Sequence, residues 1–536
     1  AYYVYSQDGD EYTGPSSGIS LLSDTGLDWI RKAFNGSQDM CNVLKSVNMD
    51  VASHLQMPKC IPANPWASNA WDVSPKPFPP HEVMWEYVDA YFRTVQCIFP
   101  VLHRPVFEER LSNYLRDYYP FDPAWSALLN AVLASGCRAM LSSETPTAFE
   151  RSSQEAWGYF LNAINLIAQM VYKPTSVAVV QALAVMTVYA QGLSSPQRLE
   201  YNFCTLAVHV AQGLGMHRQP LASWNLPDHE IQERNRLFWT IYTLDKTISL
   251  RSGRPSAIDD DEISCIFPQG VITVQDGAPV CQGWGVECEV FDFFLIAARY
   301  ARICGNIARQ LYSASALHHP SEDLLPIAEE LENDLDRWRA GIPEAFRPGG
   351  DFRPSKLPSG FPFIQVLVLH FGYHDAVCAI SRRFSSMFVH YEQQPLPEPA
   401  VRVMRMKCMA ASRSTILLIK HLDIESYYPG WMLFYYPTTA LIALFIGVVS
   451  YPEVDSANND IALMHVVIGH LGRLEFITAG GTAFNKIGEL VRLARKIVQE
   501  NRTSVFPGGF QVSHATYNSD TDAKLELPFQ SPEAVC

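Results

Sequence analysis

The sequence predicts an all-α protein, a large multi-helix bundle of two helical groups joined by an irregular loop segment. Apolar residues recur with the period of an amphipathic helix in segment after segment, and short Pro/Gly/Ser breaks separate these segments. The alternation that is typical of strands is scarce. Hydrophobic residues make up 48% of the 536 residues and charged residues only 18%, which is enough buriable surface for more than one packed unit.

The first predicted unit, residues 1–80, is an N-terminal arm followed by a Pro-rich connector. Its beginning is polar and turn-rich and contains GPSSG at Gly14 to Gly18. Prolines then cluster between Pro58 and Pro80, and because proline lacks an N–H donor and fixes φ, they favour an extended connector. A domain boundary near residue 80 follows.

The helices are predicted in two groups, each helix ending at a Pro, Gly or Ser break. In one of them Leu237, Ile241, Leu244 and Ile248 form a single apolar stripe, and Gly253 supplies the stop. The first group spans residues 81–255, with helices near 82–98, 106–118, 123–140, 148–171, 176–193, 197–214 and 228–251. The second group spans residues 287–502, with helices near 288–314, 321–340, 361–387, 398–422, 433–450, 458–473 and 480–500.

Two segments outside the groups lack helical periodicity. Residues 256–286 are predicted to form an acidic, Gly-rich loop across the bundle, and residues 503–536 a polar tail. A third segment, from Ser426 to Pro452, has no charged side chain and is long enough to suggest a membrane span. Its proline, threonines and paired tyrosines, with no basic cluster beside it, favour a helix buried in a protein core.

Cysteine spacing and charge limit the function classes. The twelve cysteines are spread along the chain without a Cys-x-x-Cys pair, so they cannot build a zinc cluster. Their apolar surroundings and the absence of a secretory signal predict an intracellular protein with reduced thiols. The net charge of −14 opposes binding of a phosphate backbone by this segment alone.

A search for catalytic patterns returns no catalytic residue and no cofactor site. The one G-x-S-x-G match is the GPSSG of the polar arm, where neither a strand nor a helix forms a nucleophile elbow. His370 and His374, with Asp375 beside them, have a spacing that could present two imidazoles to a metal, but without a third ligand nearby we interpret them as core histidines. The acidic run from Asp259 to Glu262 is interpreted as a solvated turn, so no metal site is predicted.

The most specific signal is a longer pattern. From Glu233 the chain reads ERNRLFWTIYTLDKTISLRSGRPSAIDDDEI, preceded by AVHVAQGLGMHR at Ala207 and YFRTVQCIFPVLHRPVF at Tyr91. This set resembles the regulatory region, or middle homology region, of fungal zinc-cluster transcription factors. The residues that carry the resemblance are Arg236, Trp239, Tyr242, Asp245, Gly253, Arg254 and Pro255, with Leu214, Gly215, His217, Arg218, Phe99, Pro100 and Pro105 before them.

The resemblance implies a gene regulator. In such proteins a six-cysteine zinc cluster binds DNA, and a large helical region controls activity or receives an effector. This chain lacks the cluster and begins with alanine, so zinc and DNA binding are expected only through an N-terminal cluster before Ala1. The resemblance further implies a nuclear location and a small-molecule effector or co-regulator protein as partner, with no membrane; a homodimer stays open.

We interpret the motif as mainly structural. Trp239 and Tyr242 offer large apolar bodies with one donor each, Asp245 can accept a hydrogen bond, and Arg254 can bridge the helix end to Asp245 or to the acidic run. Gly253 is placed to adopt a left-handed conformation, so Gly253→Val should cost about 1–2 kcal/mol.

The function predicted from the sequence is that of the regulatory, effector-sensing region of a fungal transcription factor, which controls transcription through recognition of a ligand or a partner. The alternative is an enzyme of fungal specialised metabolism that uses the same helical fold without a classical catalytic motif. The sequence leaves open whether a zinc cluster precedes Ala1, which effector or target DNA is recognised, and whether the fold is reused as an enzyme.

Overall fold

The computed structural model describes most of the helical region and a short piece near the N-terminus. The described residues are 11–20, 75–116, 120–141, 146–172, 174–192, 197–268, 291–350, 352–357, 363–384, 398–422, 431–477 and 486–505, with a few more within 3–4, 23–28, 42–47 and 274–279. Much of the predicted arm and connector, and nearly all of the predicted tail, lie outside these residues.

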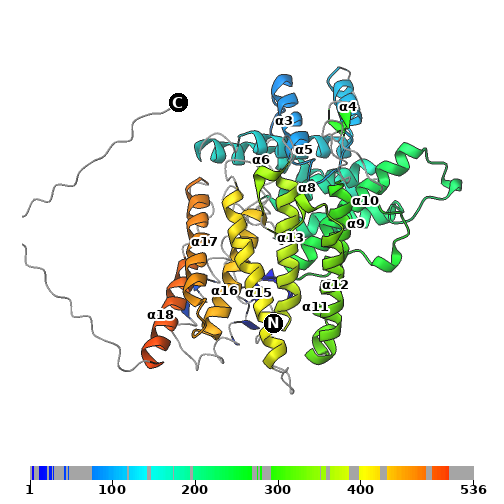
Figure 1. The fold of residues 1–536 in the computed structure, drawn as a ribbon. Helices are drawn as coiled ribbons and strands as arrows, with labels where there is room; N and C mark the ends of the chain where they lie inside the picture. The colour runs from blue at the N-terminus through cyan, green and yellow to red at the C-terminus, as the bar shows by residue number, and fades with distance from the viewer. Residues whose placement is uncertain are drawn as a thin grey trace, which may run out of the picture.

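The all-α fold class is confirmed (Figure 1). In the described part of the chain, strands are limited to two antiparallel hairpins of two-residue strands, Tyr3–Val4 with Glu11–Tyr12 and Val274–Gln275 with Ala278–Pro279. The α-helices in this part are α3 (His81–Thr94), α4 (Arg104–Arg116), α5 (Pro123–Leu141), α6 (Pro146–Asn165), α7 (Ile167–Tyr172), α8 (Val177–Gln191), α9 (Gln197–Gly213), α10 (Asp228–Ser252), α11 (Phe293–Tyr312), α12 (Ser321–Ala340), α13 (Phe363–Arg382), α15 (Glu398–Leu418), α16 (Tyr436–Ser450), α17 (Ala457–Ile477) and α18 (Ile487–Val505).

These bounds differ from the predicted ones in two places of note. The single helix expected at 148–171 is divided, because α6 ends at Asn165 and α7 begins at Ile167. The last helix continues to Val505, past the predicted start of the tail. Short helical turns fill several connections: the π-helical turn η8 (Trp431–Tyr435) leads directly into α16, and the 3₁₀ turn η3 (Asp260–Glu262) lies in the predicted acidic loop.

The helices contact one another in two sets. In the first, α5 lies against α3, α6 and α8, and α9 lies between α8 and α10. In the second, α11 contacts α12 and α13, and α13, α15, α16, α17 and α18 follow as successive neighbours; Figure 1 shows this second set standing roughly parallel. The packing of α10 against α11 joins the two sets. The predicted division into domains at 255 and 287 stays a prediction.

The most apolar helices occupy the interior. Nearly every side chain of α8 is buried, and so are most side chains of α16. Among the described residues, two helices, Phe363–Arg382 and Met432–Ser450, are long and apolar enough to cross a membrane, but most of each is buried inside the bundle, as in the core helices of soluble proteins. The second lies within the segment Ser426–Pro452, which we interpret as a buried helix.

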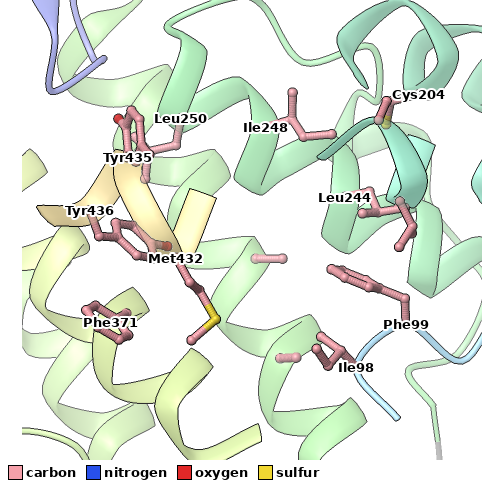
Figure 2. Close-up of a cluster of buried hydrophobic side chains, with 14 of the residues drawn as sticks. Ile98, Phe99, Cys204, Leu244, Ile248, Leu250, Phe371, Met432, Tyr435 and Tyr436 are labelled. Carbon is pink, nitrogen blue, oxygen red and sulfur yellow. The ribbon is translucent and has the colours of Figure 1, made fainter. Parts of the chain in front are cut away.

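One hydrophobic core runs through both sets. Figure 2 shows Phe99, Leu244 and Ile248 of the first set facing the same interior as Phe371 and Tyr436 of the second. The rings of Phe371 and Tyr436 stack with 5.5 Å between centroids and an interplanar angle of 5°. The seam between α10 and the η8–α16 junction is therefore part of the core.

The predicted N-terminal arm needs a correction. Residues 13–20, which include the GPSSG sequence, are all buried. We call them the inserted segment. Their side chains are small, so they fit between closely packed helices where larger residues would not.

Candidate functional site

The family-like motif holds a loop against its own helix. α10 ends at Ser252, and Gly253 follows with φ 70°, in the left-handed region, its N–H donating to the Ser249 carbonyl at 2.8 Å. The chain then turns back along α10. Trp239 lies under this loop: its Nε1 donates to the Ile266 carbonyl at 2.7 Å, and its indole stacks on Phe267 with 4.1 Å between ring centroids.

Asp245 and Lys246 fasten the start of the same loop. The buried Asp245 carboxylate accepts from the Ala257 N–H at 3.0 Å and from the Ser256 hydroxyl, while burial raises its pKa. Lys246 is also buried; its Nζ donates to the Ile258 carbonyl at 2.7 Å and lies 3.4 Å from the Asp260 carboxylate. Lys246 thus fastens the loop as Asp245 does, although the sequence pattern does not point to it.

The remaining motif residues complete this arrangement. Burial raises the pKa of Tyr242, and the Asp260 carboxylate beside it raises the pKa further. Burial lowers the pKa of Arg236. The Pro255 carbonyl accepts from the Tyr201 hydroxyl at 3.0 Å.

Arg254 contacts the N-terminal part of the chain and α9. Its Nε donates to the Tyr12 carbonyl at 3.3 Å, and its guanidinium lies 5.2 Å from the centroid of the Tyr201 ring. In the acidic run Lys246 pairs with Asp260 and Arg218 with Glu262. The bridge from Arg254 to Asp245 or to this run stays a prediction.

The earlier part of the pattern supports the far end of the loop. Gly215 has φ 70°, and the carbonyl of Leu214 accepts from Arg234 Nη2 at 2.6 Å. The His217 carbonyl accepts the N–H groups of Ser264 and Cys265 at 3.0 and 3.2 Å. These contacts are architectural, because they join a loop to the helix beneath it.

The inserted segment crosses the seam between the two sets of helices. On the α10 side the Gly14 N–H donates to the Ser252 carbonyl at 3.0 Å, and the Ser16 hydroxyl to the Leu250 carbonyl at 2.9 Å. On the other side the Gly18 N–H donates to the Tyr435 hydroxyl at 3.1 Å. That hydroxyl donates in turn to the Arg251 carbonyl at 3.0 Å, so one tyrosine bonds both the segment and α10.

Two close approaches explain the glycines of the segment. A Cβ on Gly14 would lie 1.8 Å from the carbonyl oxygen of Gly253, and a Cβ on Gly253 would lie 2.4 Å from Gly14. A Cβ on Gly18 would lie 2.4 Å from the Thr439 side chain of α16. The fit between segment and helices therefore requires small residues on both sides.

Four buried charges lie at this seam. Arg251 of α10 and Glu200 of α9 form an ion pair at 3.3 Å, and both side chains are less than 10% exposed, at 7% and 4%. Arg382 of α13 donates its Nη2 to the Ser16 carbonyl at 2.5 Å. Asp375 lies on the same helix as Arg382; burial raises its pKa to about 6, although Arg382 and Arg251 act to lower it.

A small cavity adjoins these charges. It lies between α13, α15 and α16, and is lined by Asp375, Cys378, Arg382, Thr415, Tyr436, Thr439 and Ala440. It has room inside for only about one water molecule. Drug-sized ligands occupy pockets of about 300–1,000 Å³. In this conformation the cavity is too small for such a ligand.

His370 and His374 are buried core residues. Burial lowers the pKa of His370 to about 3 and that of His374 to about 4, so both imidazoles are neutral at physiological pH. The centroids of the His370 and Phe352 rings lie 4.7 Å apart. Among the described residues, no group of three or more His, Cys, Asp or Glu is arranged to hold a metal.

The cysteines that the structure describes are free thiols. Burial raises the pKa of Cys97, Cys137, Cys204, Cys265 and Cys304. Cys378 and Cys408 lie together where α13 meets α15, and the hydrogen bond from Cys378 lowers the pKa of Cys408. The reducing surroundings expected from the sequence stay a prediction.

We predict that Asp375→Asn stabilises the protein at neutral pH. The folded-state pKa of about 6 exceeds the ordinary value of 3.8, so the folded protein holds more protons than the unfolded chain between these values. The wild type therefore loses stability as pH rises from about 4 to 6, by up to about 3 kcal/mol, and the amide variant does not.

The groups that face Asp375 in this balance are Arg251, Tyr300, Cys304, Arg382, Cys408, Tyr435 and Tyr436. Chemical denaturation at a series of pH values, with the exposed Asp261→Asn as control, measures the effect. If the difference in the free energy of unfolding between the variant and the wild type stays constant with pH, the prediction is contradicted.

Comparisons with known proteins find a match within the helical region and relatives along most of the chain. Residues 88–340 match the model of the fungal specific transcription factor domain. An ABC-transporter-regulating transcription factor of Aspergillus oryzae is 29% identical over 91% of this chain and 54% of its own length, and one of Aspergillus fumigatus is 28% identical over the same shares. A transcriptional regulatory protein of Schizosaccharomyces pombe is 25% identical over 82% of this chain and 55% of its own length.

The first helical set and the start of the second therefore resemble the fungal specific transcription factor domain, and proteins similar to this chain are named as fungal transcriptional regulators. This confirms the resemblance to the middle homology region. The chain spans about half the length of the curated relatives it matches.

Proposed function

We propose that this chain is the regulatory region of a fungal transcription factor and that the intact protein controls transcription in the nucleus. The observation that carries the proposal is the match of 91% of the chain to two ABC-transporter-regulating transcription factors, together with the fungal specific transcription factor domain at 88–340. We infer from the names of these two relatives that genes for ABC transporters are among its targets.

In this proposal DNA binding and reception of the signal belong to different parts of the protein, because of the net charge of this chain. With a net charge of −14, the chain repels a phosphate backbone, so DNA is bound by a zinc-cluster domain outside these residues. The helical region then receives the signal, either a small-molecule effector or a co-regulator protein. The small cavity beside Asp375 and Arg382 supports a site at the seam that must widen before a drug-sized effector enters.

A reporter assay tests the proposal. Residues 1–536 are inserted between a heterologous DNA-binding domain and an activation domain, and transcription is compared with the same fusion lacking them. We expect the insertion to change reporter output. Gly253→Val, which disturbs the seam, should change it again, whereas Gly469→Ala, at a site with no atom within 4 Å of the added Cβ, should not. Equal output from all four fusions would contradict a regulatory role.

A further inference from the structure

The inserted segment, residues 13–20, is bound like a peptide ligand. Its hydrogen-bond partners are distant in sequence. The Ser16 hydroxyl donates to the Leu250 carbonyl, and the Gly14 N–H donates to the Ser252 carbonyl. The Gly18 N–H donates to the Tyr435 hydroxyl. Within itself it makes only successive turns, from the Ser17 N–H to the Gly14 carbonyl and from the Ser20 N–H to the Ser17 carbonyl. From Thr13 to Ile19 it lies outside the helices and strands that the structure describes.

Its anchorage is weak compared with that of a core helix. The sequence TGPSSGIS carries only one large apolar side chain, Ile19, which is buried in the core. Fixing the backbone of a glycine- and serine-rich segment costs much conformational entropy, and net hydrogen-bond energies are modest. Such a segment belongs to the part of a protein that opens before the rest unfolds.

The Arg382 guanidinium, which the inserted segment covers, has a second acceptor nearby in the Asp375 carboxylate. Arg382 donates its Nη2 to the Ser16 carbonyl, and the Arg382 Nε has no hydrogen-bond partner. Asp375, on the same helix, lines the same small cavity and interacts electrostatically with Arg382. When Ser16 leaves, the guanidinium can turn to the Asp375 carboxylate. The buried cation then keeps an acceptor in both states, which removes the main barrier to release.

We propose that the groove between the C-terminal end of α10, α13 and the η8–α16 junction is a peptide-docking site, that its occupant is residues 13–20, and that docking is reversible. The undocked state loses the bonds by which the segment bridges α10 and Tyr435 of the second set of helices. The bond from the Tyr435 hydroxyl to the Arg251 carbonyl does not involve the segment. The proposal goes beyond the regulatory function and is tested on the purified chain, so it can fail while the function stands.

Hydrogen exchange on the full 536-residue chain measures the opening directly. We expect amides of the inserted segment to exchange at least about tenfold faster than those of the buried helix α8, because they open locally. If amides of the segment and of α8 exchange at the same rate, both exchange only through global unfolding. The segment would then be a permanent part of the core, and the proposal would be overturned.

A matched pair of serine variants identifies the bonds that hold the segment. Ser16→Ala removes the bond to the Leu250 carbonyl, whereas Ser23→Ala removes only a local bond from the Ser23 hydroxyl to the Ser20 carbonyl. We expect Ser16→Ala to speed exchange of the segment by several-fold, up to about tenfold, and to leave α8 unchanged. Equal exchange in the two variants would count against docking through this groove.

Competition with a synthetic peptide tests recognition in the groove. A fluorescent peptide of residues 13–20 should bind the Gly14→Val chain, whose own segment cannot seat, at least about tenfold more tightly than it binds the wild type. The same peptide with Gly14→Val should bind neither. If circular dichroism shows that the Gly14→Val chain does not fold, the Ser16→Ala chain replaces it. No preference for the wild-type peptide would overturn the proposal.

Discussion

Gly253→Val should lower the free energy of unfolding by about 2–5 kcal/mol. Left-handed strain contributes about 1–2 kcal/mol for a residue with a Cβ, and forcing atoms into a filled space costs about 1–3 kcal/mol more. Here the added Cβ would lie 2.4 Å from the backbone of Gly14. The motif alone predicts only the first of these costs, because the inserted segment that supplies the second comes from the other end of the sequence.

Denaturant unfolding monitored by circular dichroism checks this value. Gly469→Ala in α17 is the control, because no atom lies within 4 Å of the new Cβ and alanine favours a helix. Gly14→Val disturbs the same contact from the other side, so the costs of the two substitutions should not add in the double variant. A stability of Gly253→Val equal to that of the wild type would mean that the close approach of Gly14 and Gly253 does not exist.

Arg251→Met should lower the free energy of unfolding by about 3–5 kcal/mol, because it leaves the buried Glu200 carboxylate without the cation of its ion pair. Burial already raises the pKa of Glu200. Without Arg251 the carboxylate should bind a proton at a still higher pH. The loss of stability should therefore be greater at pH 8 than at pH 5.

Two controls separate this effect from the loss of a side chain. The double variant Arg251→Met/Glu200→Met should recover most of the loss, since a buried ion pair is commonly replaced by apolar residues at little cost. Arg93→Met removes the exposed pair with Asp89, whose side chains are 66% and 37% accessible, and should cost less than about 1 kcal/mol. Similar losses in Arg251→Met and Arg93→Met would show that the buried pair contributes nothing special.

The helices could be predicted from the sequence because their signals are local. The stripe of Leu237, Ile241, Leu244 and Ile248 and the stop at Gly253 lie within one stretch of chain, and α10 has nearly the predicted bounds. The prediction of one continuous helix at 148–171 was wrong at Leu166, where a turn bonded to the Ala163 carbonyl separates α6 from α7. Apolar periodicity continues across such a turn and does not reveal it.

The candidate site at the seam could not be predicted in the same way. The GPSSG sequence has no periodicity, and its burial depends on carbonyls of α10 more than two hundred residues away. In the sequence Asp375 stands out only as a neighbour of His370 and His374. The structure places it with Arg382 beside a cavity. Glu200 and Lys246 look like ordinary surface charges in the sequence, and only tertiary packing buries them. The glycines of the segment were the one available signal.

The most direct measurement of the central claim is the RNA content of cells in which the encoding gene is deleted and then restored. If the chain is the regulatory region of a transcription factor related to the two Aspergillus regulators, deletion should change transcripts of ABC transporter genes, and the intact gene should restore them. Restoration with the Gly253→Val allele should be incomplete. Unchanged transcripts, accompanied by the loss of a single metabolite, would contradict the account and favour an enzyme built on the same helical fold.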